Sequence, residues 1–226
     1  MAEIFAFPAG AAAMRSGDGA GKPQHLVRPH GVPDVMWSAV ESVRVMPHRD
    51  GVIYREIPVP ATLADFGIGV EFEVTSCAMT DAARDIGADF RGQCNVYPAA
   101  GWLMLLYARK PREEWDSCWR CVAFAKLPLD VVENDALTPS MIWESMRDFI
   151  IGRAEPGTLA GTVTVTSNTA FGNLGGEPHA GCEIRASWTP LDGTGAGATM
   201  DAGTQVNSWA AFIQSTVRPQ EEHDVE

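Results

Sequence analysis

Two cysteines separated by two positions, Cys118 and Cys121, are the residues of this chain with the clearest chemical potential. A CxxC spacing is typical of redox dithiols and of half zinc sites, and both uses need the two sulfur atoms to point to one place. Here the motif lies in SCWRCVAFAKL, where apolar residues alternate as in a β-strand. Residues i and i+3 of a strand face opposite sides of the sheet. We therefore interpret both cysteines as small buried residues and predict no metal and no cofactor.

Four further polar or aromatic residues are candidates for contact with a partner or ligand. Trp115 lies in a charged loop, ARKPREEWDS, and an exposed loop aromatic is a common binding anchor. Arg185 and Ser187 alternate outward on a predicted strand, beside a row of threonines that includes Thr164. The alternative interpretation is that this face is merely wetted by solvent and that Trp115 only packs.

Motifs of catalysis do not accompany these residues. The sequence contains no GxSxG, no HExxH and no GxxxxGK[ST], and its five histidines are scattered. Glu71 and Glu73 share the outer face of one predicted strand with nothing apolar between them, so we interpret them as solvated charges and not as an acid pair. We predict no catalytic residues, which leaves enzymatic activity uncertain and makes a non-enzymatic role the leading one.

Composition restricts the partners and the location. The 226 residues carry a net charge of −12, and residues 1–34 contribute three acidic and three basic side chains, so the whole excess lies beyond them. Such a field repels phosphates and anionic headgroups, which argues against nucleic acid and membrane surfaces. The apolar run GWLMLLYA is too short to span a bilayer. Five cysteines, an odd number, indicate free thiols and a cytoplasmic location.

Periodicity divides the chain into a disordered extension (1–34), a single folded domain (35–217) and an acidic tail (218–226). Two start signals predict helices: Asp34 as a cap of the first, and Thr138 as N-cap with Pro139 behind it for the second. A Gly-rich loop is expected over 191–203. The other predicted elements are an extended piece at 54–59, strands at 68–75, 101–108 (buried on both faces), 117–127, 162–166 and 182–189, and a last helix at 206–217.

This order predicts the fold class. Runs of strands between single helices favour an α+β domain, with a mostly antiparallel sheet of five or six strands and helices packed on it, in the order α-β(3-4)-α-β(2)-α. About ten residues with several glycines separate the last two strands, so residues 160–191 should form an antiparallel hairpin.

Several blocks of the sequence resemble a known family. They are WSAVESVR with EIPVPATLADFGIGVEFEV, WRCVAFAKLPLD, IWESMRDFI, and AGTVTVTSNTAFG with EIRASWTPL, which together span about residues 36 to 215. These blocks resemble the actinobacterial proteins grouped as domain of unknown function 3000. The resemblance implies a bacterial cytoplasmic protein; it implies no activity and assigns no role to any residue.

The element order is also similar to that of type III secretion chaperones and YbjN-like proteins, which implies self-association and binding to segments of other proteins. The leading hypothesis is therefore a non-enzymatic, chaperone-like interaction module that forms a homodimer and binds an unknown protein partner. The alternative is an enzyme acting on a small molecule, with a site assembled from separate strands. A pocket with converging titratable groups of strongly shifted pKa would favour the enzyme.

Overall fold

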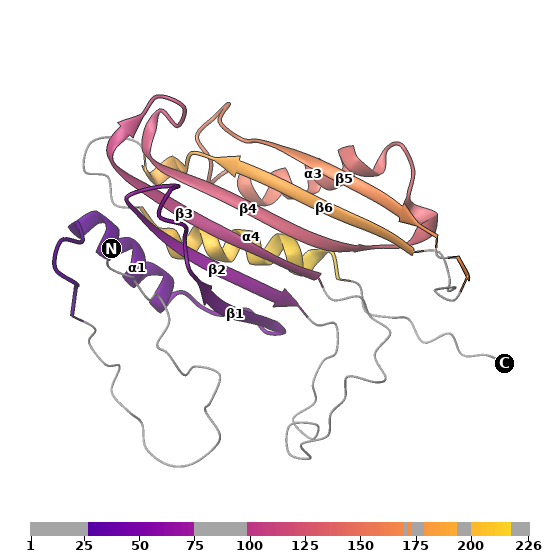
Figure 1. The fold of residues 1–226 in the computed structure, drawn as a ribbon, viewed down its shortest axis with the longest axis horizontal. Coiled ribbons are helices and arrows are strands. Elements are labelled where there is room, and N and C mark those ends of the chain that lie inside the picture. Colours follow the sequence, from indigo (N-terminus) through magenta and orange to yellow (C-terminus); the bar gives the residue numbers. More distant parts are fainter. Residues whose placement is uncertain (1–26, 75–98, 170, 173–178, 194–199, 218–226) are drawn as a thin grey trace, which may run out of the picture.

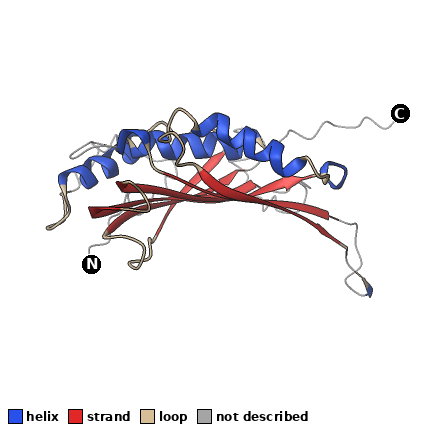
Figure 2. Ribbon diagram, turned by 90° about the horizontal axis from the view of Figure 1, so that it is seen from above, coloured by secondary structure: helices blue, strands red, loops and turns tan. Residues whose placement is uncertain are grey.

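The computed structural model describes residues 27–74, 99–169, 171–172, 179–193 and 200–217. These residues form one six-stranded sheet with three α-helices packed against one of its faces (Figures 1 and 2). The helices are α1 (Asp34–Val45), α3 (Thr138–Ile150) and α4 (Ala202–Ser215). The strands are β1 (Val52–Ile57), β2 (Phe66–Val74), β3 (Ala99–Arg112), β4 (Ser117–Leu129), β5 (Ala160–Asn168) and β6 (His179–Trp188).

The strands lie in the order β1-β2-β3-β4-β6-β5, and every neighbouring pair is antiparallel. The predicted α+β class and the order α-β(4)-α-β(2)-α are confirmed, and so is the β5–β6 hairpin. The chain passes from β4 through α3 to the sheet edge before it returns, so β6 lies between β4 and β5 (Figure 1). Predicted features within 1–26, 194–199 and 218–226 lie outside the described residues.

The core lies between the sheet and the helices. On β2, Ile68, Val70 and Phe72 are buried and alternate with glycines and glutamates, because a half-buried strand sends successive side chains to opposite faces. Trp209 of α4 packs over the sheet from the helix side and is fully buried. Its indole N–H donates to the carbonyl oxygen of Phe124 at 3.4 Å.

The prediction that 101–108 is buried on both faces is wrong at Trp102 and Met104, although Leu106 on the same side as these two residues is buried. Leu103 and Leu105 face the helices and are fully buried, whereas Trp102 and Met104 face the other side and are only half-buried. No helix of the described chain covers that side (Figure 2). We call it the open face. It carries Glu71 and Glu73 of β2, Trp102, Met104 and Leu106 of β3, Arg120, Val122 and Phe124 of β4, Arg185 and Ser187 of β6, and Thr162 and Thr164 of β5.

Both predicted helix caps are corrected by the structure. The N-cap of α1 is Pro33, and Asp34 lies in the first turn. At α3 the Asp135 carboxylate accepts hydrogen bonds from the backbone N–H groups of Leu137, at 2.7 Å, and Thr138, at 3.0 Å. Thr138 begins the helix, and its hydroxyl donates instead to the carbonyl oxygen of Glu133. A carboxylate three residues upstream therefore replaces the hydroxyl that the sequence pattern predicted.

The Asp135→Ala variant should lower the melting temperature at neutral pH, because two backbone N–H groups at the start of α3 lose their acceptor. Those N–H groups hold the pKa of Asp135 below its usual range. With a depressed folded-state pKa, the stabilisation is present above the unfolded-state value of about 4 and is lost as the pH falls through the folded-state pKa. The difference in melting temperature between the two proteins should therefore shrink in acid.

Thermal unfolding followed by circular dichroism across this pH range provides the measurement. Asp148→Ala, on an exposed position of the same helix, is the matched control and should change the melting temperature little. A difference between wild type and Asp135→Ala that stays constant from neutral to acid pH would show that the carboxylate is not the stabilising group.

Candidate functional site

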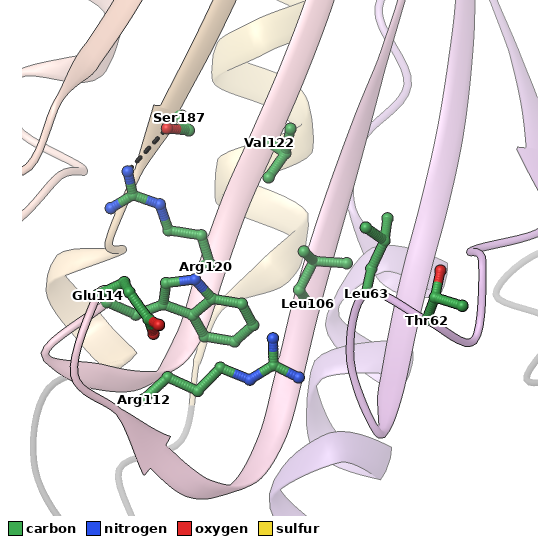
Figure 3. A pocket seen from close by; sticks show the side chains of 9 residues that line it. Thr62, Leu63, Leu106, Arg112, Glu114, Arg120, Val122 and Ser187 are labelled. Atoms are coloured by element: carbon green, nitrogen blue, oxygen red, sulfur yellow. Dashed lines mark hydrogen bonds between the residues drawn. The ribbon is translucent and has the colours of Figure 1, made fainter.

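A pocket of about 450 Å³ opens on the open face, beside the β3–β4 hairpin (Figure 3). Four parts of the fold supply its walls: the β1–β2 connection, β3, β4 with its hairpin turn, and β6. In Figure 3, Arg120 reaches toward Ser187 on one side, and Leu63 and Leu106 lie on the other. The lining residues are Thr62, Leu63, Leu106, Arg112, Glu114, Trp115, Arg120, Val122 and Ser187.

The hairpin brings an arginine and a tryptophan to this wall. Tyr107 pairs with Trp119 and Arg112 with Ser117, so β3 carries extra residues there and the ladder shifts register. The turn closes through Asp116, whose φ of 50° lies in the left-handed region that aspartate tolerates. The guanidinium carbon of Arg112 lies 4.3 Å from the centroid of the Trp115 ring. This cation–π contact fixes both side chains at the rim of the pocket.

Arg120 forms the polar wall. Its guanidinium donates to the hydroxyl oxygens of Ser187, at 2.7 Å, and Thr189, at 3.3 Å. Thr189 in turn donates to the carbonyl oxygen of Trp115 at 2.7 Å, which ties β4, β6 and the hairpin turn together. Burial lowers the pKa of Arg120 from its ordinary value. None of the ion pairs found among the described residues includes Arg120, so its positive charge faces hydroxyl groups and the pocket.

The pocket continues into an apolar band along β3 and β4. Leu106 and Val122 form its floor, and Met104 lies directly across the ladder from Val122. Beyond them Trp102 and Phe124 are cross-strand partners whose ring centroids lie 5.9 Å apart at an interplanar angle of 27°. A half-buried guanidinium at the end of an apolar band suits an anionic group attached to an apolar body.

The structure brings two of the four predicted contact residues together, since both Trp115 and Ser187 line the pocket. Arg185 does not line it: this exposed side chain contacts the Glu183 carboxylate at 2.9 Å and lies over the Phe124 ring at 5.3 Å. Thr164 is exposed on the edge strand β5, across from Glu183, and also lies outside the pocket.

The sequence interpretation missed Arg112 and Arg120. Arg120 had a readable signal, because it alternates outward on the strand that carries the CxxC motif. The proximity of Arg120 to Ser187 had no signal in the sequence, because it depends on the pairing of β6 with β4.

The CxxC cysteines face opposite sides of β4, as predicted. Cys121 is fully buried on the helix side, and burial raises the pKa of its thiol far above the ordinary value. Cys118 is half-buried on the open face, so the prediction that both are buried is wrong for this residue; desolvation raises its pKa as well. Burial raises the pKa of Cys182 to about 11. Cys77 and Cys94 lie outside the described residues.

Glu71 and Glu73 lie on the open face as predicted, but they are not isolated solvated charges. The Arg55 guanidinium contacts the Glu71 carboxylate at 3.5 Å and the Glu73 carboxylate at 3.0 Å. All three side chains are more than a third exposed, so these pairs contribute little to stability. Among the described residues, no group of three or more histidine, cysteine, aspartate or glutamate side chains is arranged to hold a metal ion.

Comparison with known proteins gives one match. The model of a family described as "Protein of unknown function (DUF3000)" matches residues 32–220. No curated protein and no solved structure matches the chain. The similarity to type III secretion chaperones therefore stays a prediction. The helices of the described ranges are all too short or too polar to cross a membrane.

Proposed function

This chain belongs to the DUF3000 family of proteins of unknown function, and we propose that it is a non-enzymatic protein-binding module. The proposed ligand is an extended, largely apolar segment of a partner protein with one acidic side chain; the segment lies against the open face with this carboxylate in the pocket at Arg120. The module is chaperone-like in the sense that it holds a segment of another protein. We place it in the cytoplasm, which the free thiols of Cys118, Cys121 and Cys182 support.

The observation that supports this proposal most directly is the set of partners around the Arg120 guanidinium. Its guanidinium is half-buried and held by two neutral hydroxyl groups, and none of the described ion pairs supplies it with a carboxylate. A buried or half-buried cation is stabilised most by a hydrogen-bonded anion. The guanidinium has more N–H groups than its two hydroxyl partners use, so it can also donate to a ligand oxygen.

The apolar band supports a peptide as the body of the ligand. Trp102, Met104 and Phe124 continue from the floor of the pocket along the strands. In an extended segment, alternate side chains lie on one side. A carboxylate side chain at Arg120 and apolar side chains two and four residues away would therefore contact the pocket and the band together.

The ionisable groups that line the pocket favour binding over catalysis. They are Arg112, Glu114 and Arg120. General acid–base catalysis uses a group that loses and regains a proton near neutral pH, and the guanidinium groups of Arg112 and Arg120 remain charged there. Glu114 is the one carboxylate of the lining, and it is exposed in the hairpin turn rather than enclosed with a catalytic partner. No specific feature of the lining supports the alternative of an enzyme acting on a small molecule.

A peptide display selection on the full-length protein tests the proposal. We expect the enriched peptides to carry an aspartate or glutamate next to apolar or aromatic residues. Replacing Arg120 by glutamine should weaken binding of such a peptide about 10- to 100-fold, because a charge-assisted hydrogen bond contributes about 1.5–3 kcal/mol. Isothermal titration calorimetry with the purified variants measures this change.

Arg147→Gln is the matched control. It removes the same charge from α3, on the helix side of the sheet, where Arg147 pairs with Glu144 at 3.1 Å. This variant should bind the peptide as the wild type does. Enriched peptides without an acidic residue, or equal binding by wild type and Arg120→Gln, would refute the proposed mode of binding.

A further inference from the structure

We propose that the chain forms a homodimer in which β5 pairs with β5 of a second copy, so that two six-stranded sheets become one continuous sheet. The strand lies at the end of the sheet order, and in the described part of the chain no strand covers its outer edge. It is nine residues long, AGTVTVTSN, and contains neither a charged residue nor a proline. Exposed edges of this kind template further pairing, and proteins guard them with charges, prolines or bulges unless a partner covers them.

The sequence of β5 is nearly symmetric about Thr164. Reading outward from this residue gives valine, threonine and then a small residue in both directions, over Gly161–Ser167. Antiparallel pairing across a twofold axis at Thr164 would place Val163 opposite Val165 of the partner subunit, Thr162 opposite the partner's Thr166, and Thr164 opposite itself. Threonine pairs and pairs of β-branched side chains at directly opposed positions stabilise antiparallel sheets.

The two faces of the sheet are compatible with this axis. A twofold axis perpendicular to the sheet keeps each face on its own side, so the helices of both copies would lie on one side. Val163 and Val165 face the helices, whereas the threonines belong to the open face. Helix α3 packs directly over β5: a side chain at Gly161 would come within 2.9 Å of the Trp143 ring. Where the two sheets meet, Val163 and Val165 of each copy would therefore lie on the side that α3 covers.

The opposite edge of the sheet lacks these features. Strand β1 has six residues and carries two charged residues, Arg55 and Glu56. Two prolines, Pro58 and Pro60, follow it in the chain and limit its extension. Charged residues and the prolines that follow protect β1 from pairing with another strand, whereas β5 has neither. Strand β5 is therefore the edge that a second copy covers.

Net charge opposes this association without acting at the junction. Each chain carries −12, so two copies repel at long range, but β5 itself is uncharged. Because salt screens repulsion between separated charges, self-association should strengthen as the ionic strength rises. The interface uses the sheet edge, so it is independent of the pocket and of the proposed peptide binding.

A charge at the twofold axis tests the inference. Thr164 is exposed in one copy, and its cross-strand neighbour there is Glu183, so Thr164→Lys should leave the single chain folded. In the dimer it would place two lysines directly opposite each other. Sedimentation at micromolar concentration and moderate salt should give the wild type a mass near twice 24.3 kDa. The variant should show the single mass, with self-association at least about 10-fold weaker.

Two further variants fix the place of the interface. Thr164→Glu should also be monomeric alone, and mixing it with Thr164→Lys should restore the double mass, because opposite charges then meet at the axis. Ile53→Lys adds the same charge at an exposed position of β1 and should leave the dimer intact. Circular dichroism verifies that each variant is folded. A monomeric wild type at low and high salt, a dimeric Thr164→Lys, or a mixture that stays monomeric would each overturn the inference.

Discussion

Replacing Trp209 by alanine should lower the free energy of unfolding by about 3–5 kcal/mol, the usual cost of removing a fully buried tryptophan. The indole of Trp209 is completely enclosed, with ring centroids of Trp188 and Phe212 at 5.9 Å and 5.3 Å. It joins α4 to the sheet both by packing and by its hydrogen bond to the carbonyl oxygen of Phe124. Alanine would leave a cavity between these layers and would remove the hydrogen bond to the carbonyl oxygen of Phe124.

Urea unfolding followed by far-ultraviolet circular dichroism measures the loss without depending on tryptophan fluorescence. The midpoint should fall by roughly 1–2.5 M, since the denaturant slope for a domain of this size is about 2–3 kcal/mol/M. Trp115→Ala is the control, because it removes an equal side chain from a half-buried surface position. If both variants lost the same stability, α4 would not be held by the packing described above.

The general architecture could be predicted from sequence because the signals are local. Ile68, Val70 and Phe72 alternate with polar residues or glycine, and only a half-buried strand explains that pattern. The turn chemistry before His179 likewise favoured a hairpin. The apolar run in β3 misled the interpretation, because Trp102 and Met104 are apolar on a face without helices. Periodicity reports which residues are apolar; whether a second layer covers them depends on elements far away in the chain.

The candidate site was only half predictable for a related reason. Trp115 and Ser187 could be named as candidate contact residues from a loop position and from strand alternation alone, and both line the pocket. The guanidinium of Arg120 is positioned by hydrogen bonds to Ser187 and Thr189, which lie 67 and 69 positions further along the chain. That proximity follows from the insertion of β6 between β4 and β5, and no local pattern encodes it. The shift in register that brings Arg112 to Trp115 is equally invisible in the spacing of apolar residues.

Trp115→Ala should have the reverse effect to Trp209→Ala: a large loss of binding with little loss of stability. The ring of Trp115 forms one wall of the pocket and is stacked by Arg112. Tryptophans that become buried under a bound partner commonly contribute 2 kcal/mol or more, so binding of the selected peptide should weaken by about 30-fold or more. The free energy of unfolding should change by about 1 kcal/mol or less, because the residue is only half-buried and lies in a hairpin turn.

Trp115→Ala should affect binding without disturbing the fold, because the substitution keeps the backbone of residue 115. Its carbonyl oxygen accepts the hydrogen bond from Thr189, and alanine retains that acceptor, so the link between the hairpin turn and β6 survives the substitution. Arg120 keeps its own two hydroxyl partners, and only the aromatic wall is lost. Calorimetric titration of the peptide, combined with urea unfolding of the same sample, separates the two effects. Unchanged peptide affinity, or a loss of stability as large as that of Trp209→Ala, would show that Trp115 serves the fold and not the partner.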